Sequence, residues 1–420
     1  MLSWRARIQA NEDRMTVVQR ALSQTFNRFF ASEKAGGIVL IACTIISLLL
    51  ANSPLGQDYL HFWHVQVAGL SVELWVNDAL MAIFFLLIGL ELERELYSGE
   101  LSDLRNALLP VLAAAGGIAA PALIHFMLNQ GLPSQRGVGI PMATDIAFAL
   151  GVLALLGKRV PASLKVFLTA LAVMDDLGAI VVIALFYTSG VSLAYLGGAL
   201  AVFAVLLVMN KRLRIVALAP YIAGGILMWF LMLKSGVHAT IAGVLLAFAI
   251  PYSATEDDAA SPSHRLEHAL HFPVAFLILP IFALANTGIV IGAGWMEELV
   301  SPNSLGIIAG LVLGKPLGIT LTCLAAVLLG VCRLPLDLSW RHVFGAGILG
   351  GIGFTMSIFI TNLAFSASPD LINASKMAIL AASLTAGLIG FVWLKAFGQP
   401  TAADADTGTM DFESADRSAR

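Results

Sequence analysis

Charged side chains are scarce in this sequence. Lys, Arg, Asp and Glu make up 12% of the 420 residues, whereas a soluble domain carries about 25% of them. Hydrophobic residues make up 58%, and uncharged apolar runs of about 20 residues, the length that crosses a bilayer, recur along the chain. The scarcity of charge excludes an ordinary soluble protein and indicates a polytopic membrane protein.

Cysteines and basic blocks are also few. The three cysteines, Cys43, Cys323 and Cys332, lie in or at the ends of apolar runs, which excludes a disulfide framework or a metal-binding cysteine set. The net charge of −3 and the lack of a basic block exclude nucleic acid as a partner. Residues 1–34 are polar and contain no apolar stretch, so we expect no cleavable signal peptide. No cofactor is predicted.

The apolar runs predict helices. Only helices and closed barrels satisfy the backbone in lipid, and barrel strands would alternate with period two, whereas these runs are continuous. We therefore predict an all-α polytopic membrane protein with about twelve transmembrane helices. The predicted spans are 36–52, 76–97, 107–128, 134–156, 163–187, 192–209, 215–233, 236–251, 266–286, 304–330, 342–365 and 372–397.

The distribution of basic residues predicts the orientation. If both termini are cytoplasmic and twelve helices cross, nearly all of the 24 lysines and arginines lie on the cytoplasmic side. Arg136 and Lys234 fall on the opposite side, and Lys315 and Lys376 lie within spans. This asymmetry agrees with the positive-inside rule.

Segments outside the spans complete the predicted organisation. Residues 61–78 alternate apolar and polar side chains around Ala68 and Gly69, which predicts a β-hairpin; an irregular loop is the alternative. The chain thus divides into a cytoplasmic segment 1–34, a membrane domain 35–397 with a periplasmic hairpin at 58–76, and a disordered cytoplasmic tail 398–420.

Two adjacent acids, Asp175 and Asp176, lie in the fifth span. A carboxylate in hydrocarbon costs roughly 2.5–3.5 kcal/mol, so the pair predicts a wet cavity or a bound cation. A structural role, with one acid paired to a lysine or capping a broken helix, is the alternative.

The fourth and eleventh spans are interrupted. In the fourth, Gly137, Gly139 and Pro141 precede Thr144 and Asp145, and irregular backbone at membrane depth is tolerated only around a cavity or within protein. The eleventh holds five glycines between 345 and 353, followed by Thr355 and Ser357. Paired interrupted segments in corresponding positions point to a transporter's binding site.

Other polar residues interrupt the apolar pattern. Lys315 lies deep in the tenth span, which predicts an intramembrane Asp as its partner; a lysine that reaches the interface is the alternative. Asp78 opens the second span. At the cytoplasmic face a histidine–carboxylate cluster would titrate near neutral pH. The alternative is that these residues only form a solvated helix end. The cluster contains Glu91, Glu93, Arg94, Glu95, Glu267, His268 and His271.

Several motifs together resemble the NhaA-type sodium/proton antiporters of bacterial inner membranes. The resemblance covers about residues 33–397 and includes GLELERELYSGEL, PMATDIAFALG, TALAVMDDLGAI, KSGVHATIAG (with His238), RLEHALH, LGKPLGI and GIGFTMSIFI. It implies inverted repeats in which spans 4 and 11 are discontinuous and cross.

The resemblance also implies roles for residues. Asp175 and Asp176 would bind Na⁺ and protons, with Thr144 beside them. Asp145 and Lys315 would offset the facing helix ends, and Lys315 would pair with Asp175. Glu91, Arg94, Glu95, Glu267, His268 and His271 would sense pH, and the hairpin would form a homodimer contact. Glu93 departs from the basic residue expected at its position.

These observations predict exchange of Na⁺, and also Li⁺, for protons across the bacterial inner membrane, and no enzymatic activity. Two acids per Na⁺ would make the exchange electrogenic. One alternative is a sodium-coupled symporter for an organic solute, which would need a larger polar pocket. Another is an intramembrane aspartyl protease that pairs Asp145 with Asp175 or Asp176, but the sequence has no Gly-x-Gly-Asp motif.

Overall fold

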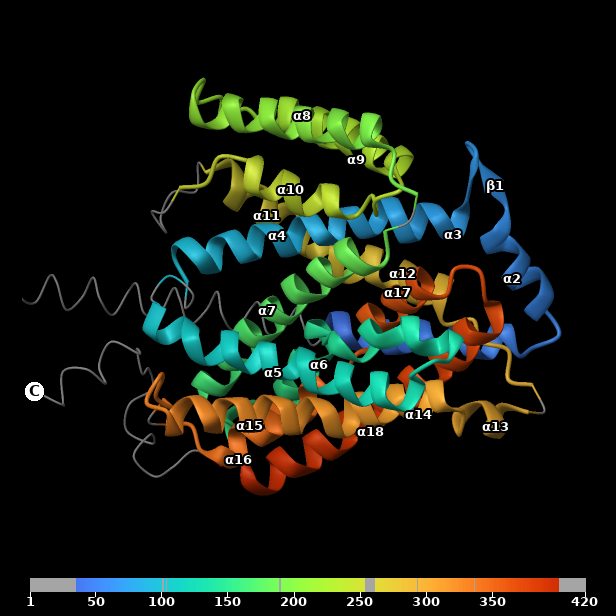
Figure 1. Ribbon diagram of the computed structural model, residues 1–420, viewed down its shortest axis with the longest axis vertical. Coiled ribbons are helices and arrows are strands. Elements are labelled where there is room, and N and C mark those ends of the chain that lie inside the picture. Colours follow the sequence, from blue (N-terminus) through green and yellow to red (C-terminus); the bar gives the residue numbers. More distant parts are fainter. Residues whose placement is uncertain are drawn as a thin grey trace, which may run out of the picture.

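The computed structural model describes residues 35–99, 102, 104–188, 190–253, 261–292, 294–335 and 337–399. These residues are almost entirely helical (Figure 1). The predicted cytoplasmic segment 1–34 and all but the first two residues of the predicted tail 398–420 lie outside the described residues.

The α-helices carry the labels of Figure 1. An unlabelled first helix spans Ala35–Ala51. It is followed by α2 Gly56–His64, α3 Val72–Leu74, α4 Met81–Tyr97, α5 Leu104–Asn129, α6 Ile146–Leu156, α7 Ala162–Phe186, α8 Leu193–Lys211, α9 Leu218–Ser235, α10 Ile241–Ala249, α11 Pro262–Pro273, α12 Leu279–Asn286, α13 Trp295–Leu299, α14 Pro302–Ala309, α15 Lys315–Leu328, α16 Trp340–Gly350, α17 Phe354–Ala364 and α18 Pro369–Phe397.

Wider and tighter helical turns join some of these elements. Three π-helical segments make long continuous spans: η1 (Trp75–Leu80) leads into α4, η4 (Val274–Ile278) joins α11 to α12, and η5 (Gly310–Gly314) joins α14 to α15. Two 3₁₀ helices, η2 (Pro133–Met142) and η3 (Gly157–Arg159), precede and follow α6.

Local chemistry explains where several helices begin and end. Ser301 caps α14, because its hydroxyl accepts a hydrogen bond from the Ser304 N–H, and Pro302 occupies the first helical position. At a helix C-terminus, α9 is followed by Gly236, whose φ of +82° lies in the left-handed region that glycine adopts without strain.

Length and composition give the number of membrane spans. Eight helices in the described residues are long and apolar enough to cross a membrane, and the number rises to 11 if each of three bent pairs is one span. Two of those pairs are the predicted broken spans: η2 with α6, bent by 41°, and α16 with α17, bent by 45°. The predicted polytopic all-α class and its two discontinuous spans are confirmed.

The order of unbroken and broken spans repeats along the chain. α5, the pair η2–α6 and α7 correspond to α14–α15, the pair α16–α17 and α18. α14–α15 runs opposite to α5 (Figure 1), and the Asn129 side-chain amide at the end of α5 donates to the Pro302 carbonyl at the start of α14. The two units therefore have opposite directions, as the inverted-repeat prediction requires.

Two large hydrophobic cores divide the helices. The larger core contains residues from the first helix, α4 to α7, α10, α12 and α14 to α18. A smaller core joins α8, α9 and α10 to Leu86 and Leu90 of α4. In Figure 1 α8 and α9 form the outermost layer beyond α4 and α10, while α7 crosses obliquely between that layer and the α5–α15–α18 layer.

The predicted β-hairpin is shorter than the sequence pattern indicated. β1 (Gln66–Val67) and β2 (Leu70–Ser71) pair antiparallel around Ala68 and Gly69, with Val67 opposite Leu70. The predicted strand residues 61–64 and 72–78 are helical instead. The strand prediction from the alternation over 61–78 was therefore wrong for most of that segment, because the end of α2 and the start of the next span occupy it.

In the predicted eighth span, 236–251, the helix is confined to α10, Ile241–Ala249. α10 has nine residues and is about 13.5 Å long, whereas the hydrocarbon core is about 30 Å thick. Gly236 ends α9 in the left-handed conformation, and residues 237–240 form a turn before α10 begins. The polar and glycine residues in KSGVH account for this loss of helix.

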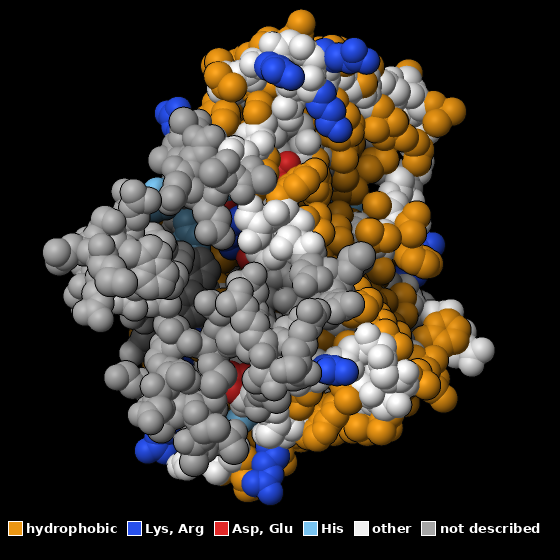
Figure 2. Space-filling view, turned by 90° about the vertical axis from the view of Figure 1, so that its left-hand side faces the viewer, with side chains coloured by type: hydrophobic (Ala, Val, Ile, Leu, Met, Phe, Trp, Pro, Cys, Tyr) orange, Lys and Arg blue, Asp and Glu red, His pale blue; other side chains and the backbone are white. Residues whose placement is uncertain are grey.

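Basic side chains gather at one end of the bundle. α4, α8 and α18 carry Arg94, Lys211 and Lys395 in their last turns, and Figure 2 shows several Lys and Arg side chains around this end, beside a broad hydrophobic surface. The hairpin and the last turn of α9, with Lys234, lie at the opposite end. This arrangement agrees with the charge asymmetry in the sequence.

Candidate functional site

The two broken spans cross at their breaks. The Asp145 N–H donates to the Ile352 carbonyl over 2.7 Å, and the Ser357 hydroxyl donates to the Ile140 carbonyl over 2.7 Å. Each break therefore supplies hydrogen-bond partners for backbone groups that the other leaves unpaired. These hydrogen bonds help to satisfy irregular backbone at membrane depth.

Asp145 lies between two helix N-termini. One carboxylate oxygen accepts from the Phe148 N–H at the start of α6 over 3.0 Å. The other accepts from the Thr355 N–H, over 3.1 Å, and from the Thr355 hydroxyl at the start of α17. A carboxylate at this place offsets the positive ends of both helix dipoles.

These contacts bear on the protease alternative. Both oxygens of Asp145 are engaged by helix N-termini and Thr355, and within the described residues no hydrogen bond joins Asp145 to Asp175 or Asp176. A dyad that shares one proton needs two carboxyl groups in direct contact, so this arrangement does not favour proteolysis.

Lys315 and Asp175 form a fully buried ion pair. Both side chains are 0% exposed. The Lys315 Nζ also donates to the Thr144 hydroxyl over 3.1 Å, and that hydroxyl contacts the Asp175 carboxylate at 2.7 Å and the Gly350 carbonyl at 2.8 Å. The predicted intramembrane Asp partner of Lys315 is confirmed, and Thr144 joins the pair to the second broken span.

Glycines make room for Lys315. It follows the π-helical segment η5, and a Cβ on Gly310 or Gly314 would come within 2.7 Å or 2.8 Å of Pro141 or Pro121. On the other side, a Cβ on Gly318 would lie 2.2 Å from the Gly116 carbonyl of α5. Only glycine permits this close approach, which brings the lysine backbone directly against α5 and the first break.

Asp176 differs from its neighbour. It is 1% exposed, and neither of its carboxylate oxygens has a hydrogen-bond partner among the described residues; the second oxygen of Asp175 also has none. A buried ionised carboxylate without a partner is strongly unfavourable. We therefore expect these oxygens to bind a proton or a cation. Alkali cations accept hard oxygen ligands, and the site offers the carboxylates, the Thr144 hydroxyl and nearby backbone carbonyls. The described residues contain no group of three or more His, Cys, Asp or Glu arranged for a metal ion.

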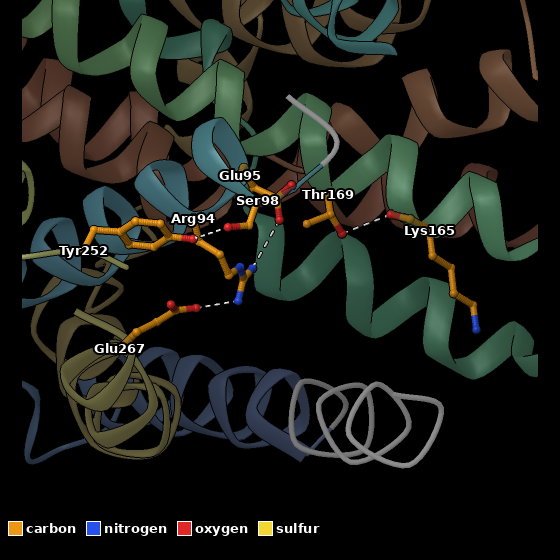
Figure 3. A network of polar contacts seen from close by, with 7 residues as sticks. All are labelled: Arg94, Glu95, Ser98, Lys165, Thr169, Tyr252 and Glu267. Atoms are coloured by element: carbon orange, nitrogen blue, oxygen red, sulfur yellow. Dashed lines mark hydrogen bonds and ion pairs between the residues drawn. The ribbon is translucent and has the colours of Figure 1, made fainter. Parts of the chain in front are cut away.

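A second polar cluster lies at the basic end of the bundle (Figure 3). Arg94 of α4 donates to Glu267 of α11 over 2.5 Å and to Glu95 over 3.3 Å, and Ser98 contacts the Tyr252 hydroxyl at 2.6 Å. Glu93, which replaces an expected basic residue, is 5% exposed and accepts a hydrogen bond from Ser263. The structure thus joins α4 to α11 through these groups.

The remaining cluster residues are less closely joined. Glu91 is half-buried, His271 is half-buried and His268 is exposed. The structure therefore brings Arg94, Glu95 and Glu267 into direct contact, whereas Glu91 and His268 lie on the same helices without a hydrogen bond to that group in the described part of the chain.

Asp78 and His238 lie towards the hairpin end. Asp78 is half-buried in the π-helical segment before α4, and its carbonyl accepts from the Trp229 ring N–H over 3.2 Å. His238 lies in the turn before α10, and its Nε2 is 3.0 Å from the Tyr187 carbonyl. Burial lowers the pKa of His238.

Two features were not found from the sequence. One is Tyr187, whose hydroxyl contacts backbone groups of η2. The other is a buried amide group in which Asn286 donates to Asn77 over 2.8 Å and accepts from Asn362. Single asparagines in three separate apolar spans were a signal for the second; a tyrosine at a span end is too common at membrane interfaces to be a signal for the first.

Comparisons with known proteins show the family of the chain. The model of a family described as Na⁺/H⁺ antiporter 1 matches residues 27–394. The chain is 72% identical to the Na⁺/H⁺ antiporter NhaA of Dechloromonas aromatica over 385 residues, 92% of this chain and 99% of that protein. It is 59% identical to the NhaA of Cytophaga hutchinsonii, over 89% of this chain and 96% of that protein.

A solved structure shares the fold. The sodium proton antiporter MjNhaP1 from Methanocaldococcus jannaschii aligns with a TM-score of 0.50 and 14% identity, over 90% of this chain and 97% of that chain. This identity is low, so the likeness concerns the fold alone. The family model covers most of the chain, and the relatives match nearly their full lengths, so this multi-span membrane protein belongs to the Na⁺/H⁺ antiporter 1 family.

Proposed function

We propose that this protein exchanges Na⁺, and also Li⁺, for protons across the bacterial inner membrane, in sodium and pH homeostasis. The observation that carries the proposal is Asp176, a buried carboxylate with no partner on either oxygen in the described structure, next to a carboxylate held by Lys315. Such a group holds either a proton or a cation. The names of the bacterial relatives, Na⁺/H⁺ antiporter NhaA, support this pair of ions.

Competition at the two aspartates would couple the ions. In the proton-loaded state Asp176 is protonated, and protonated Lys315 pairs with ionised Asp175. Na⁺ then binds between both carboxylates and displaces Lys315. One proton leaves from Asp176 and one from Lys315, so two protons exchange for each Na⁺.

This balance makes the exchange electrogenic. One net positive charge moves in the direction of the protons, and about 2.3 kcal/mol per 100 mV is available from the membrane potential to drive it. Alternating access would expose the site to each side in turn as one helix bundle moves against the other. Asp145 would keep the facing helix N-termini compensated throughout.

Orientation and regulation complete the proposal. Both termini would be cytoplasmic, which places the basic end of the bundle and the cluster of Arg94, Glu95 and Glu267 inside the cell. That cluster, with Glu91, His268 and His271, would sense cytoplasmic pH. Asp78 and His238 would lie on the periplasmic half of the pathway, and the hairpin would join two copies of the chain.

Replacing the aspartates tests the exchange directly. Asp176→Asn should abolish Na⁺-dependent proton release at every pH from 6.5 to 8.5, because the site loses the group that holds either ion. Asp175→Asn should also fail, since the site loses the charge that attracts Na⁺. The measurement is a pH-sensitive dye in everted vesicles given Na⁺, Li⁺ or K⁺ pulses.

Asp370→Asn is the matched control, because Asp370 is an exposed acid in the first turn of α18. It should exchange Na⁺ like the unchanged protein. Na⁺-dependent proton release by Asp176→Asn above that of empty vesicles would refute the proposed role of Asp176. Na⁺-driven accumulation of an organic solute without proton release would point to the symporter instead.

Lys315→Ala tests the ion pair. It leaves Asp175 charged and unpaired in a low dielectric, so the free energy of unfolding should fall by about 3 kcal/mol, and the pH at which Na⁺ binds should change. Thermal denaturation in detergent and Na⁺ binding at several pH values measure the two effects. Lys211→Ala, at an exposed lysine of α8, should change neither; if Lys315→Ala behaves in the same way, the lysine takes no part in exchange.

The cytoplasmic cluster should set the pH response. In this proposal the positively charged histidines next to Glu267 hold the inactive arrangement. Replacing His268, His271 and Glu267 with Gln removes those charges, so the pH profile of Na⁺ exchange should move towards lower pH. His61→Gln is the control, since His61 is exposed on α2 at the opposite end. A profile that stays in place would mean that the cluster is only a solvated helix end.

The hairpin should hold a homodimer. Val65 and Val67 are 41% and 50% exposed, and a short edge of this kind can extend a sheet across a two-fold axis. The Val72 N–H donates to the Val65 carbonyl over 3.0 Å, so one glycine in place of residues 66–71 would join two ends that this bond already holds close together. We expect monomers that still exchange ions; a dimer on a native gel would exclude this contact.

A further inference from the structure

The first half of the fourth span is an unusual helix. η2 is a 3₁₀ helix of ten residues, Pro133–Met142, whereas 3₁₀ runs longer than three or four residues are uncommon because their hydrogen bonds are poorer. It leads directly to Ala143 and Thr144, and Thr144 contacts both Lys315 and Asp175. The placement of η2 therefore decides where the Thr144 hydroxyl lies.

Tyr187 connects this helix to α7 through hydrogen bonds. The residue follows the last residue of α7, and its hydroxyl donates to the Arg136 carbonyl over 2.8 Å and accepts from the Gly139 N–H over 3.1 Å. One phenol thus serves a carbonyl and an N–H of the same 3₁₀ helix. Burial raises the pKa of Tyr187 to about 12, so the hydroxyl keeps its proton over the physiological range.

Gly139 leaves room for this contact. A Cβ at position 139 would lie 2.7 Å from the Tyr187 hydroxyl oxygen and 3.2 Å from its ring, and separations under 3.0 Å are not tolerated by packed atoms. A side chain at this position would therefore push the phenol away. The glycine leaves the η2 backbone open at the one side from which the hydroxyl approaches.

The tyrosine backbone is held from a third element. The Tyr187 carbonyl accepts from the Nε2 of His238, over 3.0 Å, in the turn between α9 and α10; a carbonyl only accepts, so this ring nitrogen carries the hydrogen. The end of α7 is thus fixed by the neighbouring helices while its side chain reaches η2. The same helix, α7, carries Asp175 and Asp176.

We propose that Tyr187 is a positioning residue for ion exchange. By hydrogen bonding to η2 from the end of α7, its hydroxyl holds Thr144 beside the carboxylates on that helix. The inference rests on the proposed Na⁺/H⁺ exchange at Asp175 and Asp176. Tyr187 does not touch the ion, and it acts through η2 and Thr144.

Tyr187→Phe removes the hydroxyl and keeps the ring. Losing both hydrogen bonds to η2 should raise the KM for Na⁺ about tenfold, while the maximal rate of exchange stays within about twofold. Tyr195→Phe, at a tyrosine of α8 that is 45% exposed, is the matched control and should leave both values unchanged. Dye-reported exchange in everted vesicles over a range of Na⁺ concentrations measures them.

A double-variant cycle separates positioning from a general loss of stability. If Tyr187 acts through Thr144, Tyr187→Phe should add little to the KM of Thr144→Ala, because coupled residues are not additive. A KM for Tyr187→Phe equal to that of the unchanged protein would overturn the inference. Full additivity of the two changes would overturn it as well.

Gly139→Ala probes the contact from the other side. It should also raise the KM for Na⁺, because the new methyl group displaces the hydroxyl. Combined with Tyr187→Phe, which removes that oxygen, it should add no further increase, and an additive increase would contradict the proposed contact. If the unchanged protein itself shows no Na⁺-dependent proton release, the proposed function fails, and that outcome is distinct from a failure of Tyr187 to position η2.

Discussion

The structure depends on keeping charges stable where water is excluded. Lys315 and Asp175 are both fully buried and form an ion pair, and Asp145 is held between two helix N-termini. Removing one partner of such a pair is costly, whereas the intact pair roughly balances its desolvation. A site built in this way tolerates exchange of one positive partner for another, which is what replacement of Lys315 by Na⁺ at Asp175 would require.

Close helix contact makes this electrostatic arrangement possible. A Cβ on Gly347 would come within 2.8 Å of Pro316, and one on Gly351 would lie 2.3 Å from the Leu311 carbonyl. The second broken span therefore lies directly on the helix that carries Lys315. With larger residues the helices would separate, and the break at Thr144 could not hydrogen bond to Gly350. The glycines that looked like helix breakers in the sequence also set the distance between helices.

Much of the site was predictable because a charge in an apolar run is conspicuous. Asp145, Asp175, Asp176 and Lys315 each interrupt such a run, and the resemblance then indicated which of them pair. The length of the hairpin was not predictable in the same way. Apolar and polar residues alternate over 61–78, but most of that segment is helical, since alternation over a few residues fits the end of an amphipathic helix as well as a strand.

Tyr187 illustrates a different limit. Its partners are backbone groups of Arg136 and Gly139, and a contact with backbone leaves no complementary side chain for a sequence pattern to reveal. The loss of helix at 236–240 was similarly hidden, because a glycine and a histidine within an apolar stretch do not by themselves distinguish a kinked span from a turn.

The helix that carries the aspartates is attached to both broken spans. At its end, Tyr187 hydrogen bonds to η2, the first half of the fourth span. At its start, the Ser163 hydroxyl donates to Asp337, in the segment that leads into α16 of the eleventh span. α7 also crosses obliquely between the two helix layers in Figure 1. The helix that carries Asp175 and Asp176 is therefore hydrogen bonded to η2 at one end and to the segment leading into α16 at the other, so it connects the two broken spans.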